Sequence, residues 1–401
     1  MNFKRNEIPA KYIWIIDIWT YKIRVWICKI LNRNVELIWY WEKRQDINDI
    51  DLLEIKNLEN VCKNISQAVD KAQNDAKIKI DDFMINVISP NLFFESSKIN
   101  FLRNKDIPID ENEAYNILRD LESQAFRNHY KRIKNSTWYN KSDLQLIISD
   151  VLNLAIDSEN NAKNIIWTNP KNINLSILNI FVTENKAEFK NYISRYLKKN
   201  IINIIPTEFA LLSLFHDKKS VIIIDLWNSH TSIIVKKDNF VLWAKKLSFW
   251  INDLIKRIRQ NYNLTRIDII NSIDSENFLN EKTEFLEIFK DIIAISLEDI
   301  LKDEVCPENF FMVWWWANKF IKNYLEEINF NNYNLKIVKN IKFISPKIDF
   351  IDDKITENPL WIDSVKSNIN IYAMIKTALD FIKKDKSKIE RTLKEIIKEI
   401  N

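Results

Sequence analysis

Apolar residues gather in short runs near the start of the chain, and their spacing predicts β-strands followed by a helix. Strands are expected at Tyr12–Ile18, Ile23–Leu31, Glu36–Trp39 and Phe83–Ile88. Between Leu58 and Ala76 the apolar positions have the period of an amphipathic helix, whose apolar face consists of Val61, Ile65, Val69 and Ala72. The N-terminal part therefore predicts an α/β unit.

A second segment repeats the strand, turn and strand of this opening. Val221–Asp225 and Ser232–Val235 have the pattern of strands with a turn between them. In each copy an aspartate is followed two positions later by tryptophan, as Asp17-Ile18-Trp19 and as Asp225-Leu226-Trp227. An internal repeat of this kind indicates two related lobes.

The composition changes how these turns are interpreted. The 401 residues include no glycine and 14 tryptophans, whereas a soluble protein has glycine at about 7% of its positions. Glycine supplies the turns with positive φ that other residues adopt only at a steric cost. The tryptophans stand where glycine is expected, after both turn aspartates and as the triplet Trp314, Trp315 and Trp316. We interpret them as glycines encoded by UGA and translated with a table that reads UGA as tryptophan. The alternative is an aromatic-rich protein with tryptophan at binding surfaces.

Charge, cysteines and hydropathy exclude several classes of protein. The formal net charge is +4, with both signs interspersed, so no nucleic-acid partner is implied. Cys28, Cys62 and Cys306 have neither the spacing of metal ligands nor an even number for disulfides, so we expect thiols in the core. No apolar run has the length of a spanning helix, and the N-terminus lacks the apolar core of a signal peptide.

With glycine at the tryptophan positions, the two turns have the chemistry of phosphate sites. An aspartate followed by a glycine turn presents backbone N–H groups to an anion, and its carboxylate can hold Mg²⁺ through water. A third glycine-rich turn would follow the strand Phe310–Val313 and lead into a helix over Lys319–Glu327. Such a turn lets the backbone approach a purine and points a helix N-terminus at phosphate. The three turns together predict ATP and Mg²⁺ as ligands.

These segments resemble the superfamily of actin, sugar kinases and heat-shock chaperones, and within it the bacterial cell-division family FtsA. Three further stretches are similar to FtsA. Ile38–Glu42 follows the first hairpin, and Ser248–Asp253 follows the second. Leu154–Asp157, continued by Asn164–Trp167, resembles the return of the chain into the first domain. The resemblance implies an α/β, actin-like (ribonuclease H-like) two-lobed ATPase fold with an FtsA-type 1C (SHS2-like) insert.

The resemblance also implies a division of the chain into subdomains. Residues 10–83 and 158–219 would form subdomain 1A, 84–157 the 1C-type insert, 220–256 and 307–364 subdomain 2A, 257–306 subdomain 2B, 365–385 the helix returning to 1A, and 386–401 an amphipathic tail.

From the same resemblance follows the nucleotide site. The phosphate-binding residues would be Asp17, Trp19, Thr20, Tyr21, Lys22, Asp225, Trp227, Asn228, Ser229, His230 and Thr231. The adenosine-binding residues would be Trp314, Trp315, Trp316, Ala317 and Asn318, with Asp268 and Asn271 in a segment that departs from the family's Ala-Glu-x-x-Lys. Asp17 and Asp225 would hold Mg²⁺ through water. Glu208 and His230 are candidates for orienting water, and at most a slow ATPase is expected.

The C-terminal segment predicts an amphipathic helix. Ser387 and Glu390 have the spacing of a capping box. One face is aliphatic and is bordered by lysines, and its residues are Ile389, Leu393, Ile396, Ile397 and Ile400. The FtsA resemblance implies that this helix lies in the membrane interface. The alternative is a helix docked on the body of the protein.

The function implied is that of a cytoplasmic, ATP-binding cell-division protein on the inner face of the cell membrane. It would polymerise with itself, bind the C-terminal peptide of FtsZ and anchor FtsZ at the division septum. One alternative is a PilM-like adaptor of pilus or secretion assembly, against which the Asn164–Trp167 motif and the basic tail speak. Another is a small-molecule kinase, which needs a carboxylate base against a bound hydroxyl. Beyond the phosphate turns, no such segment is recognised.

Overall fold

The chain divides into two units in the structure, a computed structural model. It describes residues 11–384 apart from 32–33, 47, 52, 88, 158, 160–161, 163–164, 228–229, 274–276, 314–323, 325–329, 339–340, 345–354 and 358–368. The first unit comprises residues 1–214, 351–362 and 370–401, and the second comprises 215–350 and 363–369. Among the described residues no helix is long and apolar enough to span a membrane.

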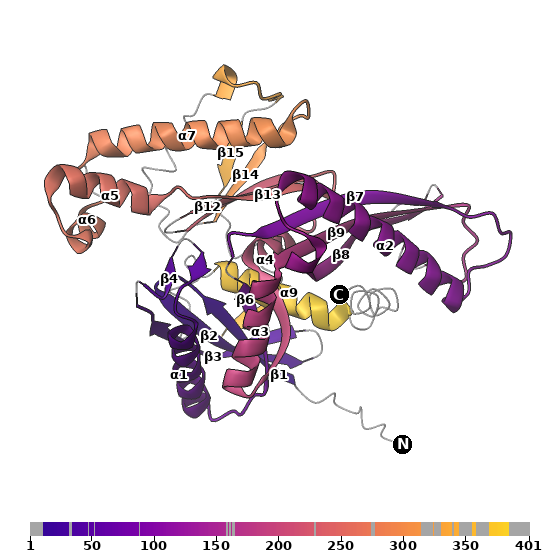
Figure 1. Cartoon of the computed structure of the whole chain (residues 1–401), viewed down its shortest axis with the longest axis horizontal. Coiled ribbons are helices and arrows are strands. Elements are labelled where there is room, and N and C mark those ends of the chain that lie inside the picture. Colours follow the sequence, from indigo (N-terminus) through magenta and orange to yellow (C-terminus); the bar gives the residue numbers. More distant parts are fainter. Residues whose placement is uncertain are drawn as a thin grey trace. The chain divides into compact units, whose positions relative to one another are not determined.

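A six-stranded sheet organises the first unit (Figure 1), in the order β10-β6-β1-β2-β3-β16. Its strands are β1 (Lys11–Ile18), β2 (Lys22–Leu31), β3 (Asn34–Arg44), β6 (Asp82–Val87), β10 (Asn200–Pro206) and β16 (Ile355–Glu357). A short pair, β4 (Ile50–Asp51) and β5 (Glu54–Ile55), precedes the helices, which are α1 (Leu58–Ala76), α3 (Glu184–Leu197), α4 (Thr207–Leu214) and α9 (Ile369–Lys384).

The predicted opening of the chain is confirmed. β1 and β2 form the expected antiparallel hairpin, and α1 has both predicted ends, with its apolar face buried. The third strand is longer than predicted, because its polar residues at Asn34 and beyond Trp39 still pair with β2. Asn57 caps α1 by accepting a hydrogen bond from the backbone of Asn60.

A three-stranded antiparallel sheet lies between β6 and α3 in the sequence. It has the order β7-β9-β8 and consists of β7 (Leu92–Leu102), β8 (Leu144–Ile156) and β9 (Asn172–Thr183), with the long helix α2 (Glu111–Ser136) and the short helix η1 (Lys141–Asp143) between β7 and β8. This is the region predicted as the insert. The end predicted at residue 157 is wrong, because β9 pairs with both other strands.

The predicted return motif needs the same correction. Ile165 and Ile166 are buried in one hydrophobic cluster with Leu118 of α2 and Leu154 of β8. The segment that we compared with a return into the first domain therefore completes the core of the insert. The chain leaves this sheet only after Thr183, at the start of α3.

A polar layer crosses the core of the insert between α2 and the sheet. Glu122 of α2 is buried and accepts hydrogen bonds from Ser149 Oγ and Asn179 Nδ2, both at 3.0 Å. Burial raises the pKa of Glu122 to about 7, against the two hydrogen bonds. Two turns along the same helix, His129 is also buried, and its burial, with Arg132 nearby, lowers its pKa to about 3. Neither nitrogen of His129 has a hydrogen-bond partner among the described residues.

The second unit contains a five-stranded sheet in the order β13-β12-β11-β14-β15. Its strands are β11 (Val221–Leu226), β12 (Thr231–Lys237), β13 (Phe240–Leu247), β14 (Asn309–Val313) and β15 (Lys342–Ile344). The helices are α5 (Ile251–Tyr262), α6 (Arg266–Ser272), α7 (Leu279–Leu301) and the short η2 (Phe330–Asn332). The predicted strands at 221–225 and 232–235 are confirmed as an antiparallel hairpin, with β14 parallel to β11.

The helices of the second unit share one hydrophobic core with its sheet. Ile258 of α5 and Phe289 of α7 belong to the same buried cluster as Ile224 and Val235 of the sheet. The start predicted for subdomain 2B at residue 257 lies within α5. Residues 257–306 therefore cover the sheet of the second unit and have no separate core in the described residues.

Candidate functional site

Asp17 is the penultimate residue of β1 and pairs directly with Arg24 of β2. The antiparallel register sets these two residues opposite each other, and both side chains are buried, with exposures of 0% and 1%. Arg24 donates to Asp17 Oδ2 from Nε at 3.1 Å and from Nη2 at 2.5 Å. This is a two-pronged, charge-assisted ion pair fixed by the geometry of the hairpin.

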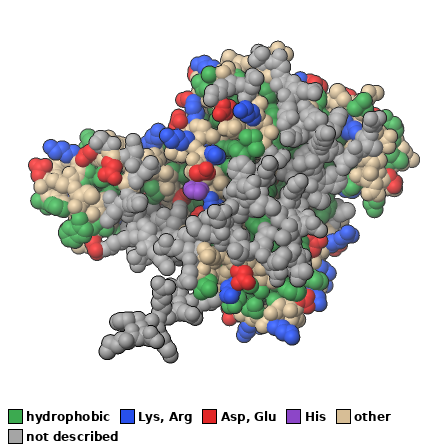
Figure 2. All heavy atoms as spheres, turned by 180° about the vertical axis from the view of Figure 1, so that it is seen from behind, with side chains coloured by type: hydrophobic (Ala, Val, Ile, Leu, Met, Phe, Trp, Pro, Cys, Tyr) green, Lys and Arg blue, Asp and Glu red, His purple; other side chains and the backbone are tan. Residues whose placement is uncertain are grey.

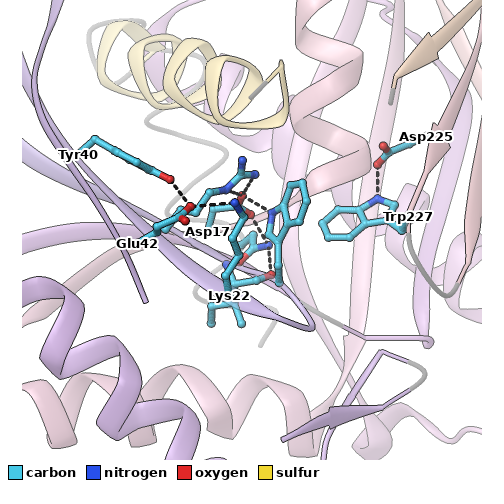
Figure 3. A network of polar contacts seen from close by, with 10 residues as sticks. Asp17, Lys22, Tyr40, Glu42, Asp225 and Trp227 are labelled. Atoms are coloured by element: carbon cyan, nitrogen blue, oxygen red, sulfur yellow. Dashed lines mark hydrogen bonds and ion pairs between the residues drawn. The ribbon is translucent and has the colours of Figure 1, made fainter. Parts of the chain in front are cut away.

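The remaining contacts of Asp17 come from Asn86 and Trp19. Asn86, on β6, donates to Asp17 Oδ1 at 2.9 Å, and its own Oδ1 accepts from the backbone N–H of Ile18 at 2.8 Å. The indole Nε1 of Trp19 donates to Asp17 Oδ2, and the guanidinium carbon of Arg24 lies 3.8 Å from the Trp19 ring centroid. Both oxygens of Asp17 are therefore engaged (Figure 3).

Lys22 is paired with an acidic side chain on the neighbouring strand. Its Nζ lies 2.8 Å from Glu42 Oε2, and the hydroxyl of Tyr40 donates to the same oxygen at 2.5 Å. Burial disfavours the charged form of Glu42, but the hydrogen bonds from Lys22 and Tyr40 outweigh it and hold the pKa of Glu42 below its ordinary value. Burial and Glu42 raise the pKa of Tyr40. Figure 3 shows these groups beside Asp17.

The turn that holds Thr20 is closed by backbone hydrogen bonds. Trp19 N–H donates to Lys22 O at 2.8 Å, and Gln45 N–H donates to Tyr21 O at 2.9 Å. The side-chain amide of Gln45 also donates to Trp19 O. Gln45, just after β3, therefore holds the turn from outside the hairpin.

The second hairpin repeats the contact between the indole and the carboxylate. Asp225 of β11 is buried, with an exposure of 2%, and accepts from the indole Nε1 of Trp227 at 2.5 Å. Trp227 N–H donates to His230 O at 2.9 Å, which closes the turn. The residue opposite Asp225 in the register is Ser232, so no arginine stands where Arg24 stands in the first hairpin.

His230 lies inside the second unit and is not an exposed turn residue. It is 4% exposed, and its ring stacks on Trp227 with 5.4 Å between centroids. Burial, and secondarily Lys246, lower its pKa well below 6.5, so the ring is neutral. Its Nδ1 has no hydrogen-bond partner within the described part of the chain. The neighbouring Thr231 donates from Oγ1 to Phe249 O at 2.9 Å.

Glu208 lies in the first turn of α4 and is 3% exposed. This helix packs on α9. Thr377 Oγ1 lies 2.9 Å from Ser213 Oγ, and the buried Lys376 donates from Nζ to Ser213 O. The ammonium group of Lys376 is therefore hydrogen-bonded to a helix carbonyl inside the first unit.

The two described residues predicted on the adenosine side are exposed. Asp268 belongs to the N-terminal cap of α6, where its carboxylate accepts from Thr265 N and its own N–H donates to Thr265 Oγ1. Asn271 lies near the end of α6. The remaining predicted residues lie outside the described part of the chain, and they are Asn228, Ser229, Trp314, Trp315, Trp316, Ala317, Asn318 and the whole face from Ile389 to Ile400.

The sequence reasoning missed Arg24, Asn86 and Gln45. Arg24 could have been predicted from the sequence. A hairpin closed at Trp19 to Lys22 puts Arg24 opposite Asp17, and arginine is rare in a buried strand without a partner. Asn86 interrupts the apolar run of β6. Gln45 had no signal, because its role depends on the length of β3.

These contacts test how well the two carboxylates fit Mg²⁺. Among the described residues no group of three or more His, Cys, Asp or Glu could hold a metal. Asp17 does not fit, because it is buried and its oxygens accept from Arg24, Asn86 and Trp19. Asp225 fits better, because its cross-strand neighbour Ser232 is neutral.

On the face shown in Figure 2, positive and negative described side chains are interspersed.

Comparison with known proteins gives the fold. No family model and no curated protein matches this sequence. Among solved structures, a PilM–PilN type IV pilus biogenesis complex matches with a TM-score of 0.64 and 9% identity, over 93% of this chain and 99% of that chain. The ethanolamine utilization protein EutJ from Carboxydothermus hydrogenoformans matches with a TM-score of 0.42 and 7% identity, over 83% and 86% of the two chains. A Bacteroides thetaiotaomicron protein of unknown function with an actin-like ATPase fold has a TM-score of 0.40 and 10% identity, over 91% and 95%.

The first of these matches covers both units and the insert at a similarity that identifies the fold and not the family. The paired strand–turn–strand units, each with a buried aspartate at the penultimate position of its first strand, agree with it. The chain has the actin-like ATPase fold that its sequence predicts.

Proposed function

We propose that this chain is a nucleotide-binding adaptor that acts by assembly and attachment. In its specific form it is an FtsA-type cell-division protein that polymerises on the inner face of the cell membrane and anchors FtsZ at the septum. The observation that carries the adaptor class is the match over 99% of a PilM chain, insert included, because PilM stands there in a complex with a second protein.

Nucleotide binding is supported by the two hairpins. Each brings a buried aspartate to the edge of a closed turn, at Asp17 and at Asp225. A bound ATP with Mg²⁺ would supply a compact negative charge that such turns bind through backbone N–H groups. Titration calorimetry with Mg-ATP tests this directly, using the chain with glycine at all 14 tryptophan positions. No heat at millimolar ATP would reject the proposal.

A PilM-like role is the second candidate, and one observation favours it. The motif Asn164–Trp167, which in the sequence spoke for FtsA, belongs to the insert core through Ile165 and Ile166. The sequence feature that still favours FtsA is the C-terminal tail. Fluorescence anisotropy with two labelled partners separates the candidates, one the C-terminal peptide of the source organism's FtsZ and the other its PilN. Binding of PilN alone would replace the division role with a pilus role.

The tail is proposed to hold the protein at the membrane. Its aliphatic residues, from Ile389 to Ile400, can bury apolar area worth on the order of 25 cal/mol per Å², and each nearby lysine adds about 1 kcal/mol at an anionic surface. One copy binds weakly, but a polymer converts many weak contacts into avidity. Changing Leu393 and Ile397 to Glu should abolish pelleting with anionic liposomes and leave ATP binding intact. A matched control, Lys388→Arg, should pellet normally.

Recoding of UGA as glycine belongs to this proposal, because the phosphate turns depend on it. The indoles of Trp19 and Trp227 both cover the carboxylate of their turn. Trp167 has φ of 65° and is 74% exposed, which suits glycine and has no packing reason for an indole. Trp14 and Trp250 are fully buried, so they decide between the two interpretations.

If Trp14 and Trp250 are genuine core residues, truncating them to glycine leaves cavities that cost about 3–5 kcal/mol each, and the all-glycine chain does not fold. If they are recoded glycines, that chain folds and binds nucleotide. Mass spectrometry of the native protein settles the same point without any variant. Peptides with tryptophan masses would refute recoding.

A further inference from the structure

Cations gather at one edge of the six-stranded sheet in the first unit, the edge where β1, β6 and β10 begin. We propose that this edge is a contact surface for an anionic lipid membrane, in addition to the C-terminal tail. The inference rests on the proposed function for the location at a membrane, but the surface lies wholly within the first unit. It contains no tryptophan, so it is the same whether or not UGA is read as glycine.

The topology brings the starts of three strands and the ends of two helices to this edge. β6 pairs in parallel with β1 on one side and with β10 on the other, so all three strands begin at the same edge. α1 leads into β6 and α3 leads into β10, so both helices end there. Asn200 joins the two segments, because its N–H donates to Asp81 O at 2.8 Å and its side chain donates to Asp82 Oδ1 at 3.0 Å.

The charges at this edge are mostly positive. The cations are Lys11, Lys77, Lys79, Arg195, Lys198 and Lys199, and the anions are Asp81 and Asp82. Lys11 Nζ lies 3.3 Å from the carboxylate of Asp82, and Lys199 Nζ lies 3.6 Å from that of Asp81. The excess of four cations equals the formal net charge of +4 of the whole chain, so the other charges of the protein cancel one another.

Neighbouring charged side chains do not offset this excess. Lys29 at the end of β2 pairs with Glu36 of β3 at 3.1 Å, and Lys71 pairs with Asp75 near the end of α1 at 3.0 Å. These pairs are neutral. Positive charge from three separate segments along one edge matches a plane of headgroup phosphates.

Two of these lysines occupy positions that favour glycine. Lys77 ends α1 with a φ of 56°, and Lys198 ends α3 with a φ of 52°. A side chain raises the energy of this left-handed conformation, and glycine is the usual residue at such a helix end. Both lysines are exposed. A lysine here also interacts favourably with the helix dipole, so the membrane role and the capping role have to be separated by experiment.

Two tyrosines extend this surface along α3. Tyr192 and Tyr196 are 36% and 42% exposed, and their rings stack with 6.4 Å between centroids. No acidic residue occurs between Phe189 and Asn200. Tyrosine and lysine each combine an apolar body with a polar tip, which suits the boundary between lipid headgroups and hydrocarbon. The aromatic pair beside the cations therefore favours a lipid surface over an acidic protein segment.

The first experiment measures binding of the full chain to phosphatidylcholine vesicles with and without phosphatidylglycerol. Lys77→Gly with Lys198→Gly removes two cations and relaxes both helix ends, so the melting temperature should stay the same or rise. Binding to the phosphatidylglycerol vesicles should fall at least about 10-fold. Unchanged binding would overturn the inference, because the two lysines would then be helix caps only.

Two further variants control for capping and for total charge. Lys79→Glu, at an exposed position that ends no helix, should also lower the binding. Lys302 is an exposed lysine that ends α7 with a φ of 50°, and it belongs to the second unit. Lys302→Gly should leave binding within about two-fold. Equal losses for Lys302→Gly and for Lys77→Gly alone would overturn the inference, because the vesicles would then respond only to net charge.

The tail variant Leu393→Glu with Ile397→Glu separates this surface from the tail. If the tail variant loses binding and the double glycine variant binds normally, the inference fails and the proposed function survives. If the double glycine variant loses binding and the tail variant does not, the surface is supported and the role proposed for the tail fails. If the unchanged chain binds neither kind of vesicle, the proposed location at the membrane fails and the inference fails with it.

Discussion

The β1–β2 and β11–β12 hairpins share a signature in sequence but differ in electrostatics. In each, the penultimate residue of the first strand is a buried aspartate, whose Oδ2 accepts from an indole two residues later. Across the strand pair, however, Asp17 meets Arg24 and Asp225 meets Ser232. A repeated motif therefore need not mean a repeated role, because a buried arginine faces the carboxylate in the first hairpin and a neutral serine faces it in the second.

Breaking the buried ion pair should have the largest effect. Arg24→Met leaves Asp17 charged and buried, which costs about 3–5 kcal/mol. In the second hairpin, Ser232→Ala removes only a neutral side chain and should cost about 1 kcal/mol. Hydrogen–deuterium exchange of the strand amides measures each hairpin separately. If the two losses were equal, the electrostatic distinction between the hairpins would be wrong.

Replacing the tryptophans should have the second-largest effect. Replacing all 14 tryptophans with glycine should raise Mg-ATP affinity at least about 100-fold, or about 2.7 kcal/mol. Restoring tryptophan singly at position 19 or 227 in that background should lower the affinity again. The loss at 227 should be greater in Mg²⁺ than in EDTA, whereas the loss at 19 should be the same in both. Calorimetric titration of the two single restorations gives the answer, and identical metal dependence would contradict it.

Lowering the pH should destabilise the second hairpin but not the first, by a smaller amount than the changes above. Burial holds the pKa of His230 well below 6.5, so below pH 6.5 the unfolded chain binds a proton that the folded second unit does not. Its contribution to stability is complete above that pH and falls by about 1.4 kcal/mol per unit as the pH decreases. The first hairpin contains no histidine. Between about pH 7 and about pH 5.5, amide exchange should show β11–β12 weakened and β1–β2 unchanged, and His230→Asn should remove the slope at β11–β12.

The smallest effect is expected at the exposed end of the first hairpin. Lys22 and Glu42 form an ion pair whose side chains are 28% and 44% exposed. Lys22→Ala should therefore cost only about 0.2–1 kcal/mol, and less at high salt. Urea unfolding at two salt concentrations measures this. A loss comparable to that of Arg24→Met would mean that Lys22, and not the buried arginine, balances the charge of Asp17.

Much of the fold follows from local patterns, which explains why parts of it could be predicted. Both hairpins and α1 lie in segments where burial and periodicity agree. The end of the insert could not be found in this way, because the place of β9 in the insert sheet depends on its pairing with β7 and β8 and not on its own local pattern. The resemblance to FtsA placed the end of the insert at a short motif. The burial of Ile165 and Ile166 in the core of the insert shows that the insert continues beyond it.

The aspartates of the candidate site could be predicted from the sequence, but the side chains that contact them could not. The aspartates are recognisable as strand ends, but the use of Asp17 depends on Arg24, which a register count supplies and a motif does not. Asp268 shows the opposite case. Its acidic character suggested a nucleoside ligand, whereas its position three residues after Thr265 makes it part of a helix cap.

The polar layer of the insert has a consequence for how α2 finds its place. An apolar helix face can slide along a sheet by one turn, about 5.4 Å, with little loss of contact. Here such a slip would carry Glu122 away from Ser149 and Asn179 and leave a carboxyl group stranded among aliphatic side chains. Only one alignment of helix and sheet satisfies it. Glu122 therefore fixes the position of α2 on the sheet, although burying its carboxyl group lowers the stability of the insert.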